Sequence, residues 1–461
     1  MIYKQNEEEM QMNEKNHQLT EGSIWKGLLR FAFPLFLGNL FQQLYNLVDS
    51  LVVGNFCGND ALAAVSSSGN LCFLMIGFFQ GVFTGASVII SQRFGAKDED
   101  GVDVAIHNTV FFAVIMGIAL SVLGVLFTPQ ILRWMGTPEN VMPNSVLYFR
   151  IYCMGLLGLV LYNTATGIFQ ALGDSKHPLY YLMIASFVNV VLDLLFVVVF
   201  DMGVAGTALA TIIGQAVSAV LAMLHLMSGR FIITISLYKI RPKKAVLRKI
   251  FGLGIPTGIQ NSVIALANVV VQTNINAFGA NAMAGCGSYS KIEGFMFIPT
   301  MCISLALTTF VGQNLGAGKT DRVKKGAVIG MGMAFGMATL FGVFFRIFAP
   351  NLLQMFSDNP EVIAIGVAQV TVEGLFYGFC AYSHAVAGIL RGAGKTTAPM
   401  MVMLIVWCVI RIIYITIMVK FIFDIRIVFT AYPLTWIISS VIYTWLYKKG
   451  NWMLGMVEFE K

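Results

Sequence analysis

The chain of 461 residues is 57% hydrophobic and only 11% charged, with a formal net charge of +7. Soluble domains have roughly 45–50% apolar and about 25% charged residues, so the composition excludes an ordinary soluble protein and indicates an integral membrane protein. We expect no nucleic-acid partner, because the basic residues lie between apolar stretches, where they act as membrane topology signals.

Twelve apolar stretches of about 20 residues follow in chain order, each long enough to cross roughly 30 Å of hydrocarbon. The polar segment up to Glu21 has no apolar signal-peptide core, so we expect the first helix to be an uncleaved anchor. The pattern predicts an all-α integral membrane protein with transmembrane helices near 31–53, 65–90, 104–128, 145–170, 179–200, 204–228, 254–276, 288–313, 326–348, 362–390, 398–421 and 427–447.

The second half of the sequence repeats the first. Gln92-x-x-Gly-Ala recurs as Gln313-x-x-Gly-Ala, and the same offset carries Pro129 to Pro350. Duplicated membrane halves are common among secondary transporters. Because each half has an even number of helices, six, we expect two six-helix lobes related by a pseudo-two-fold axis along the membrane normal.

Most Lys and Arg residues lie at the termini and in alternate connections, which face the cytoplasm under the positive-inside rule. The linker between the halves is basic, which is typical of a topology signal that also meets anionic headgroups; a regulatory role is the alternative. We predict a bacterial-type inner-membrane protein with a cytoplasmic N-terminal tail (1–24), an N-lobe (25–228), a cytoplasmic linker (229–249), a C-lobe (250–447) and a cytoplasmic C-terminal tail (448–461).

Two aspartates lie inside predicted helices of the N-lobe, where a charge costs on the order of 3 kcal/mol. Asn189 precedes Asp193 by one helical turn and Tyr45 precedes Asp49 likewise, so each pair shares a helix face. Thr211, in the sixth helix, lies at a similar depth. These residues can therefore meet in the outer half of the N-lobe.

Carboxylate, amide and hydroxyl oxygens can replace water around a small cation, and two neighbouring buried carboxyl groups can instead hold a proton. The alternative is that each aspartate only satisfies a neighbouring helix. At the offset of the repeat the second half has Val270 and Tyr414 in place of Asp49 and Asp193, so the duplicated scaffold does not need these acids. We predict a sodium or proton site, with no other metal and no cofactor.

At these residues the chain resembles the multidrug and toxic compound extrusion (MATE) family of transporters. The resemblance covers roughly residues 25 to 447. The matching elements are Pro34, Tyr45-Asn-Leu-Val-Asp-Ser-Leu-Val-Val-Gly54, Asn189-Val-Val-Leu-Asp193 followed by Thr211, and the paired Gln-x-x-Gly-Ala segments. The family implies two six-helix lobes around a central cavity, with substrates expelled in exchange for sodium ions or protons.

The resemblance places a cation network on Asp49, Asn189, Asp193 and Thr211, with Tyr45 beside it. Pro34 matches a proline about which the first helix bends; alternatively, it is a proline tolerated near a helix start. NorM-like members carry acidic residues in the seventh and tenth helices, where this chain has Ile264 and Cys380. A DinF-like arrangement, with the cation site in the N-lobe, is therefore the closer analogy.

The C-lobe has its own embedded charges, Glu293, Glu373 and Arg411. A neutralised Glu373–Arg411 pair is the favoured interpretation. The alternative is an acidic feature of the substrate cavity that attracts cationic amphiphiles.

We predict a cation-coupled antiporter that exports drugs, toxic organic cations or metabolites by alternating access. A flippase for lipid-linked saccharides is the second hypothesis. A membrane-embedded enzyme is the third, and the sequence has no catalytic cluster to support it. The expected partners are small amphiphilic or cationic molecules and the lipid bilayer, with the protein as a monomer.

The charge pattern predicts that both termini and the linker face the cytoplasm. Reporter fusions at Lys461 and within 241–249 should both give a cytoplasmic signal. An external signal from either fusion would contradict the topology of twelve helices.

Overall fold

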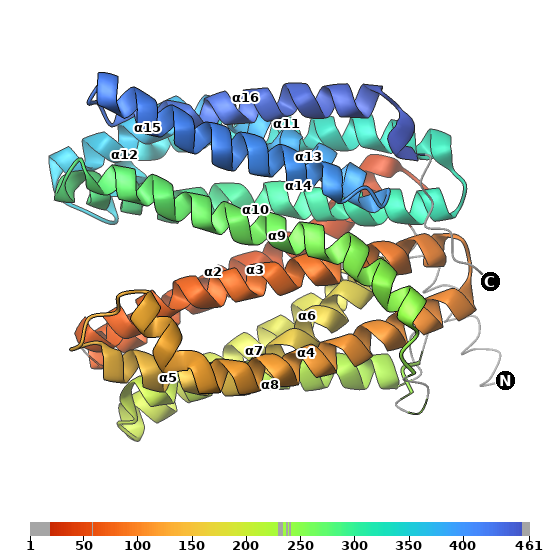
Figure 1. Cartoon of the computed structure of the whole chain (residues 1–461), viewed down its shortest axis with the longest axis horizontal. Coiled ribbons are helices and arrows are strands. Elements are labelled where there is room, and N and C mark those ends of the chain that lie inside the picture. Colours follow the sequence, from red (N-terminus) through yellow and green to blue (C-terminus); the bar gives the residue numbers. More distant parts are fainter. Residues whose placement is uncertain (1–18, 58, 229–233, 237, 239–240, 454–461) are drawn as a thin grey trace. The chain divides into compact units, whose positions relative to one another are not determined.

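The computed structural model describes residues 19–57, 59–228, 234–236, 238 and 241–453. Much of the predicted tails (1–24 and 448–461) and part of the predicted linker (229–249) lie outside these residues. The described first half forms helices α2 (Ile24–Phe56), α3 (Asn59–Gly95), α4 (Glu99–Trp134), α5 (Met142–Met154), α6 (Leu156–Ala171) and α7 (Lys176–Asp193), the π-helix η1 (Leu194–Val199), and α8 (Gly203–Met227) (Figure 1).

The described second half follows the same order. It forms α9 (Lys244–Asn276), α10 (Ala280–Gly316), α11 (Thr320–Gln354), α12 (Pro360–Glu373), the 3-10 turn η3 (Gly374–Phe376), α13 (Tyr377–Gly392), α14 (Thr397–Val402), the π-helix η4 (Met403–Ile410), α15 (Arg411–Phe421), α16 (Arg426–Lys448) and the 3-10 turn η5 (Asn451–Met453).

Ten helical segments in the described part of the chain are long and apolar enough to span a membrane. The α5–α6 pair, bent by 49°, makes an eleventh, and α2, 33 residues long, lies at the position of the first predicted span. The all-α membrane fold is therefore confirmed. The narrow gap between the fifth and sixth predicted helices is also real, because the chain turns there through Asp201 and Gly203 with φ of 52° and 53°.

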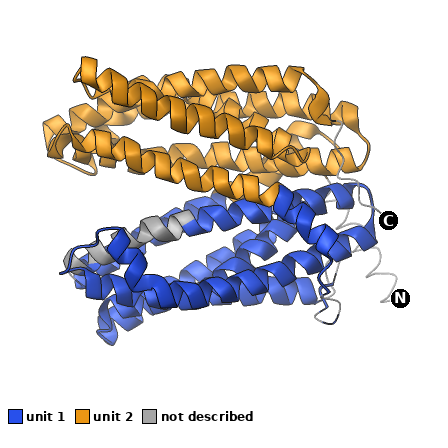
Figure 2. Ribbon diagram, in the orientation of Figure 1, with its two compact units in different colours: residues 1–18, 37–252 blue, residues 19–36, 253–461 orange. Residues whose placement is uncertain are grey.

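The chain forms two compact units that do not follow the predicted lobe boundaries. Among described residues, unit 1 is Leu37–Gly252, and unit 2 is Leu19–Phe36 together with the chain from Leu253 onward (Figure 2). The first turns of α2 thus belong to unit 2, and the first turns of α9 belong to unit 1. Leu28 and Phe31 of α2, 1% and 3% exposed, lie in the apolar core of unit 2.

The segment before α2, Leu19–Gly22, is bound to unit 2 through its backbone, and we call it the N-terminal strap. The Leu19 N–H donates to Oε1 of Gln313 at 3.0 Å. The guanidinium of Arg322 donates to the carbonyl oxygens of Gly22 at 2.9 Å and Glu21 at 2.7 Å. The glutamine of the repeated motif in the second half therefore fixes the entry into α2.

The repeated Gln-x-x-Gly-Ala motif also ends a long helix in each half. The residue after its alanine adopts a left-handed conformation, with φ of 57° at Lys97 and 70° at Gly318. This conformation turns the following amides back toward the last helical carbonyls and terminates the helix. The repeat in sequence is thus a repeat of one helix-ending structure.

Close helix packing in unit 2 depends on Gly342 in the middle of α11. A Cβ at this position would lie 2.0 Å from the carbonyl oxygen of Gly374, where α12 gives way to η3. Small residues allow such backbone approach in membrane bundles. By contrast, a Cβ at Gly336 of the same helix would meet nothing within 4 Å.

We expect Gly342→Ala to destabilise the folded protein by about 1–3 kcal/mol, because α11 and α12 must separate to admit the methyl group. Gly336→Ala is the matched control and should be neutral or slightly stabilising. Thermal unfolding of both variants in detergent provides the measurement. Equal midpoints for the two variants would contradict this account of the packing.

Candidate functional site

The structure brings the predicted acidic residues of the first half together within unit 1. The carboxyl group of Asp49, in α2, lies within hydrogen-bonding range of the Asp193 carboxyl group and the Thr211 hydroxyl. Asp193 is the last residue of α7, and Thr211 lies in α8. Tyr45 lies beside Asp49, one turn earlier in α2. Three helices therefore contribute oxygens to one place.

The oxygens at this place are buried but poorly satisfied by the protein. Asp193 is 0% exposed, Asn189 3% and Thr211 7%. With both acids ionised, no hydrogen-bond donor among the described residues reaches either carboxylate oxygen of Asp193 or Oδ1 of Asp49, and neither amide atom of Asn189 is paired. Buried polar atoms are nearly always paired in folded proteins. This donor set of carboxylate, amide and hydroxyl oxygens suits a small hard cation or a proton.

Local backbone structure places Asp193 at a change of helix type. The π-helix η1 begins directly after it, at Leu194. Such π segments occur frequently at functional sites, because the extra residue per turn redirects side chains. The α7–α8 contact is close beside Asn189, since a Cβ on Gly214 would lie 3.1 Å from the Cβ of Asn189. Small residues on α8 thus bring α7 and its polar face close.

Pro34 lies in the interior of α2, not near its start. The helix begins at Ile24, several residues before the predicted position, so the alternative of a proline near a helix start is wrong. A proline inside a helix removes one backbone hydrogen bond and kinks or weakens the helix there. Pro34 lies next to the point, after Phe36, where α2 passes from unit 2 to unit 1.

Unit 2 contains a second buried polar cluster around Glu373. Its carboxylate accepts hydrogen bonds from the Tyr289 hydroxyl at 2.8 Å and the Gln369 amide at 2.9 Å. Glu293 accepts one from the Tyr377 hydroxyl at 2.8 Å. Glu373 is 0% exposed, whereas Glu293 is only half-buried. Glu293 is therefore the more accessible of the two acids.

Glu373 and Arg411, predicted as a neutralised pair, make no direct ion pair within 4.0 Å among the described residues. The guanidinium instead donates to the Thr435 hydroxyl at 2.8 Å and lies over the rings of Tyr432 and Trp407, 4.3 and 5.3 Å from their centroids. Cation–π contacts of this kind stabilise a desolvated guanidinium. Arg411 remains close enough to compensate the acids electrostatically, without touching Glu373.

Sequence reasoning missed the hydroxyl and amide partners of these acids. The signal was present as one-turn spacing, because Tyr289 precedes Glu293 by four residues, and Gln369 and Tyr377 flank Glu373 by four on either side. Residues at this spacing share a helix face. Which acid each tyrosine reaches is decided by the packing of α10, α12 and α13, which spacing does not contain.

The repeat allows the two clusters to be compared position by position. The offset that carries Gln92 to Gln313 carries Thr211 to Tyr432, the ring on which the Arg411 guanidinium lies. In unit 2, the permanently charged guanidinium of Arg411 therefore lies against the residue equivalent to Thr211. In unit 1, two carboxylates lie near Thr211, and no basic side chain is paired with them among the described residues.

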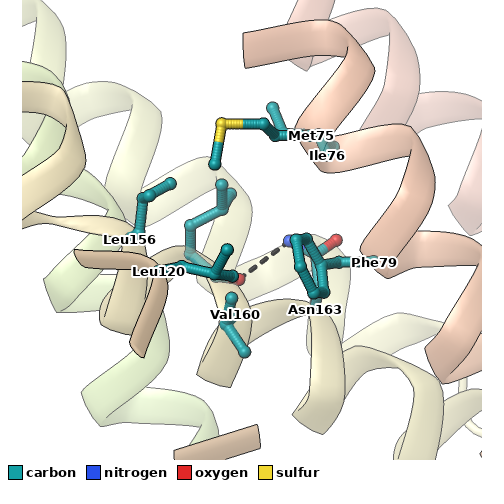
Figure 3. Close-up of a pocket in the computed structure, with 8 residues that line it drawn as sticks. Met75, Ile76, Phe79, Leu120, Leu156, Val160 and Asn163 are labelled. Atoms are coloured by element: carbon teal, nitrogen blue, oxygen red, sulfur yellow. Dashed lines mark hydrogen bonds between the residues drawn. The ribbon is translucent and has the colours of Figure 1, made fainter. Parts of the chain in front are cut away.

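Unit 1 also contains a small cavity, whose lining is apolar, unlike the two polar clusters. It is lined by Met75, Ile76, Phe79, Leu120, Leu156, Leu159, Val160 and Asn163 (Figure 3). Asn163 is its one polar lining residue, and its amide donates to the Leu159 carbonyl at 2.8 Å. With no ionisable lining group, the cavity is suited to apolar groups and not to a cation.

Comparisons with known proteins agree with this architecture. The MatE family model matches residues 34–195 and, a second time, residues 256–417. The probable multidrug resistance proteins YoeA and YpnP of Bacillus subtilis are 30% and 29% identical to the chain. The YoeA match covers 82% of this chain and 83% of the relative, and the YpnP match covers 86% and 89%.

A solved structure of a MOP superfamily transporter from Pyrococcus furiosus is 21% identical and superposes with a TM-score of 0.89. The superposition covers 95% of this chain and 98% of that one, so the fold is shared. The double match to the family model confirms the duplicated halves, and the relatives are transporters, not enzymes. The chain therefore belongs to the MATE family of multi-pass membrane transporters.

Proposed function

We propose that this transporter is a cation-coupled antiporter that exports small amphiphilic or cationic molecules by alternating access. The observation that carries the proposal is the unit 1 cluster, in which Asp49 and Asp193 lie side by side without a basic partner among the described residues. Two ionised carboxylates in a buried site repel each other, so the cluster favours the binding of a proton or a small cation. The multidrug resistance relatives support the substrate class.

A proton or cation bound at this cluster lowers the electrostatic cost of packing α2 against α7. With a cation or proton bound, the two carboxyl groups are compatible with close packing; without one, their repulsion favours separation of the helices. Exchange requires that cation and substrate prefer different states of the transporter, and linkage then makes each lower the affinity of the other. Pro34, inside α2, is the residue at which this helix can bend in response.

The same oxygens serve sodium and protons, so the coupling ion has to be identified by experiment. The protein is reconstituted in liposomes, and dye efflux is driven by a sodium gradient at clamped pH or by a pH gradient without sodium. We expect one gradient to drive transport. Efflux that ignores both gradients would reject antiport, and movement of lipid-linked saccharides in place of dyes would favour the flippase.

Neutralising either acid removes the differential cation binding, while it also lowers the cost of burying charge. We therefore expect Asp49→Asn and Asp193→Asn to abolish gradient-driven efflux at normal expression. The double variant should be little worse than either single variant, because the two residues act as one site. Asp201→Asn is the matched control, since Asp201 is exposed and asparagine tolerates its left-handed backbone.

Wild-type transport by both single variants, with wild-type cation dependence, would contradict the coupling mechanism. Loss of transport in Asp201→Asn as well would show that the assay reports general damage to unit 1.

The unit 2 acids should separate into a structural and a recognition residue. Glu373→Gln places an amide donor where the Tyr289 hydroxyl and the Gln369 amide already donate, and it removes the negative charge near Arg411. We therefore expect less folded protein and an equal loss of transport for all substrates. Glu293→Gln should fold normally and selectively lose cationic substrates. Expression level and efflux of matched cationic and neutral dyes provide the measurement. Uniform losses in both variants would remove Glu293 from substrate recognition.

A further inference from the structure

In unit 2, helices α10 and α13 touch through two glycines of α13, which we call the α10–α13 contact. A Cβ at Gly388 would lie 2.4 Å from the Ser304 carbonyl oxygen. A Cβ at Gly392 would lie equally close, at 2.4 Å, to the Thr308 carbonyl oxygen. Small residues four positions apart allow such backbone contact between membrane helices. The contact brings hydroxyl groups of α10 to α13, where Thr308 donates to the Gly388 carbonyl at 3.1 Å.

The guanidinium of Arg391 lies at the α10–α13 contact. Arg391 is in the last turn of α13, and its Nη2 donates to the Ser304 hydroxyl at 3.0 Å. The same hydroxyl donates to the carbonyl of His384 at 2.6 Å, two turns earlier in α13. The Arg391 side chain therefore extends back along its own helix, away from the helix end. Basic side chains near the end of a span usually extend toward the membrane interface instead.

No acidic side chain is paired with Arg391 in the part of the chain that the structure describes. Its electrostatic neighbours are Tyr443 and His384, and its Nε is buried without a hydrogen-bond partner. Nε2 of His384, a residue that is 3% exposed, is also unpaired. Buried polar atoms are nearly always paired, and an ionisable group inside a membrane span indicates a functional site.

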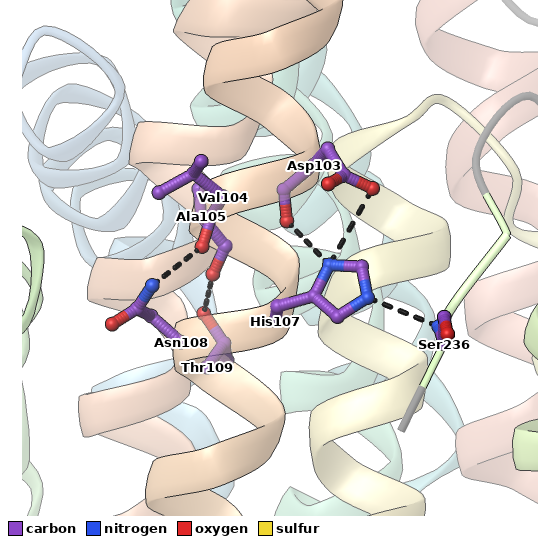
Figure 4. A network of polar contacts seen from close by, with 7 residues as sticks. All are labelled: Asp103, Val104, Ala105, His107, Asn108, Thr109 and Ser236. Carbon is purple, nitrogen blue, oxygen red and sulfur yellow. Dashed lines mark hydrogen bonds and ion pairs between the residues drawn. The ribbon is translucent and has the colours of Figure 1, made fainter. Parts of the chain in front are cut away.

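Unpaired nitrogens are not a general property of buried histidines in this protein. His107 of α4, in unit 1, is 2% exposed (Figure 4). Its Nδ1 lies 2.7 Å from the Asp103 carbonyl oxygen, and its Nε2 accepts the Ser236 N–H at 3.0 Å. The chain therefore satisfies both ring nitrogens of His107, whereas it leaves Nε2 of His384 without a partner.

The repeat shows that this helix contact does not require a positive charge. In unit 1, the equivalent bond from a hydroxyl to a glycine carbonyl joins Ser87 to Gly167 at 2.9 Å. The residue equivalent to Arg391 is Gln170, which is neutral and 9% exposed. The same contact is built there without a guanidinium, so helix packing alone does not account for Arg391.

We propose that Arg391 binds the carboxylate group of a small molecule at the α10–α13 contact. A guanidinium presents five N–H donors in a planar fork that matches a carboxylate, and the Ser304 hydroxyl occupies one of them. A bound carboxylate compensates the charge and gives Nε an acceptor. Arg391 carries a permanent charge and lies in unit 2, so the assignment does not rest on cation coupling in unit 1.

The surroundings of Arg391 favour an aromatic acid over a lipid headgroup. The ring of His384 lies against those of Phe297 and Trp407, with centroids 5.1 and 5.2 Å apart, so aromatic surface lies beside the unpaired Nε2. A lipid headgroup stays at the membrane interface, whereas the guanidinium extends away from the helix end. Arg391 is half-buried, so it is not sealed inside the bundle.

Equilibrium binding of radiolabelled benzoate to the full-length protein, in phosphatidylcholine nanodiscs without an ion gradient, tests the proposal. The wild type should bind benzoate but not benzamide, which has a similar shape without the charge. Arg391→Gln introduces the side chain found in unit 1, so it should fold, and it should weaken benzoate binding about ten-fold or more through loss of charge-assisted hydrogen bonds. Lys395→Gln is the matched control, because it removes an exposed positive charge just beyond the end of α13 and should bind benzoate like the wild type.

Absence of benzoate binding to the wild type, or equal affinity in a folded Arg391→Gln variant, would overturn the proposal. Loss of benzoate binding when phosphatidylglycerol is added to the nanodiscs would assign Arg391 to a lipid headgroup and overturn the choice of a small molecule. If Arg391→Gln does not fold, Arg391→Lys replaces it. This variant keeps the charge but loses the fork, so benzoate should still bind several-fold more weakly, and unchanged affinity would reject the guanidinium as the binding group.

Discussion

The burial of two neighbouring carboxyl groups, with no compensating base in the part of the chain that the structure describes, is the constraint on which the site in unit 1 depends. Asp49 and Asp193 come from helices far apart in sequence, so their meeting is fixed by the bundle and not by local structure. A membrane interior penalises each uncompensated charge by roughly 3 kcal/mol or more. Under the proposed function, the bundle is most stable with a proton or cation in the cluster, and its free energy of packing depends on the concentration of that ion.

The duplicated halves meet the cost of embedded charge in different ways. Unit 2 surrounds Glu373 with hydroxyl and amide donors and keeps Arg411 nearby on aromatic faces, so the charges of this cluster are compensated from within. In unit 1, no basic side chain among the described residues is paired with the two carboxylates. Under the proposed function, unit 1 is therefore the half that exchanges a proton or cation with its surroundings.

The sequence was sufficient to predict the helices but not their tertiary partners. Apolar length is a one-dimensional property, so the twelve spans and the repeat could be predicted without contacts, and the one-turn spacing of Asn189 and Asp193 gave a shared face. The direct hydrogen-bond partners of Glu373 were not predicted, because pairing by charge alone ignores hydroxyl donors such as that of Tyr289. The unit boundaries inside α2 and α9 were not predictable, since apolar sequence continues across both crossings.

The reciprocal placement of the first turns of α2 and α9 has a consequence for synthesis. Leu28 and Phe31 pack in a core built mainly from residues after Gly285, so the amino-terminal end of the chain finds its final neighbours only when most of the second half exists. Until then the first turns of α2 lack the core against which Leu28 and Phe31 pack. The two halves therefore cannot fold one after the other as independent domains. In a fragment that ends at the linker, the apolar face of the first turns of α2 would lack the unit 2 core against which it packs.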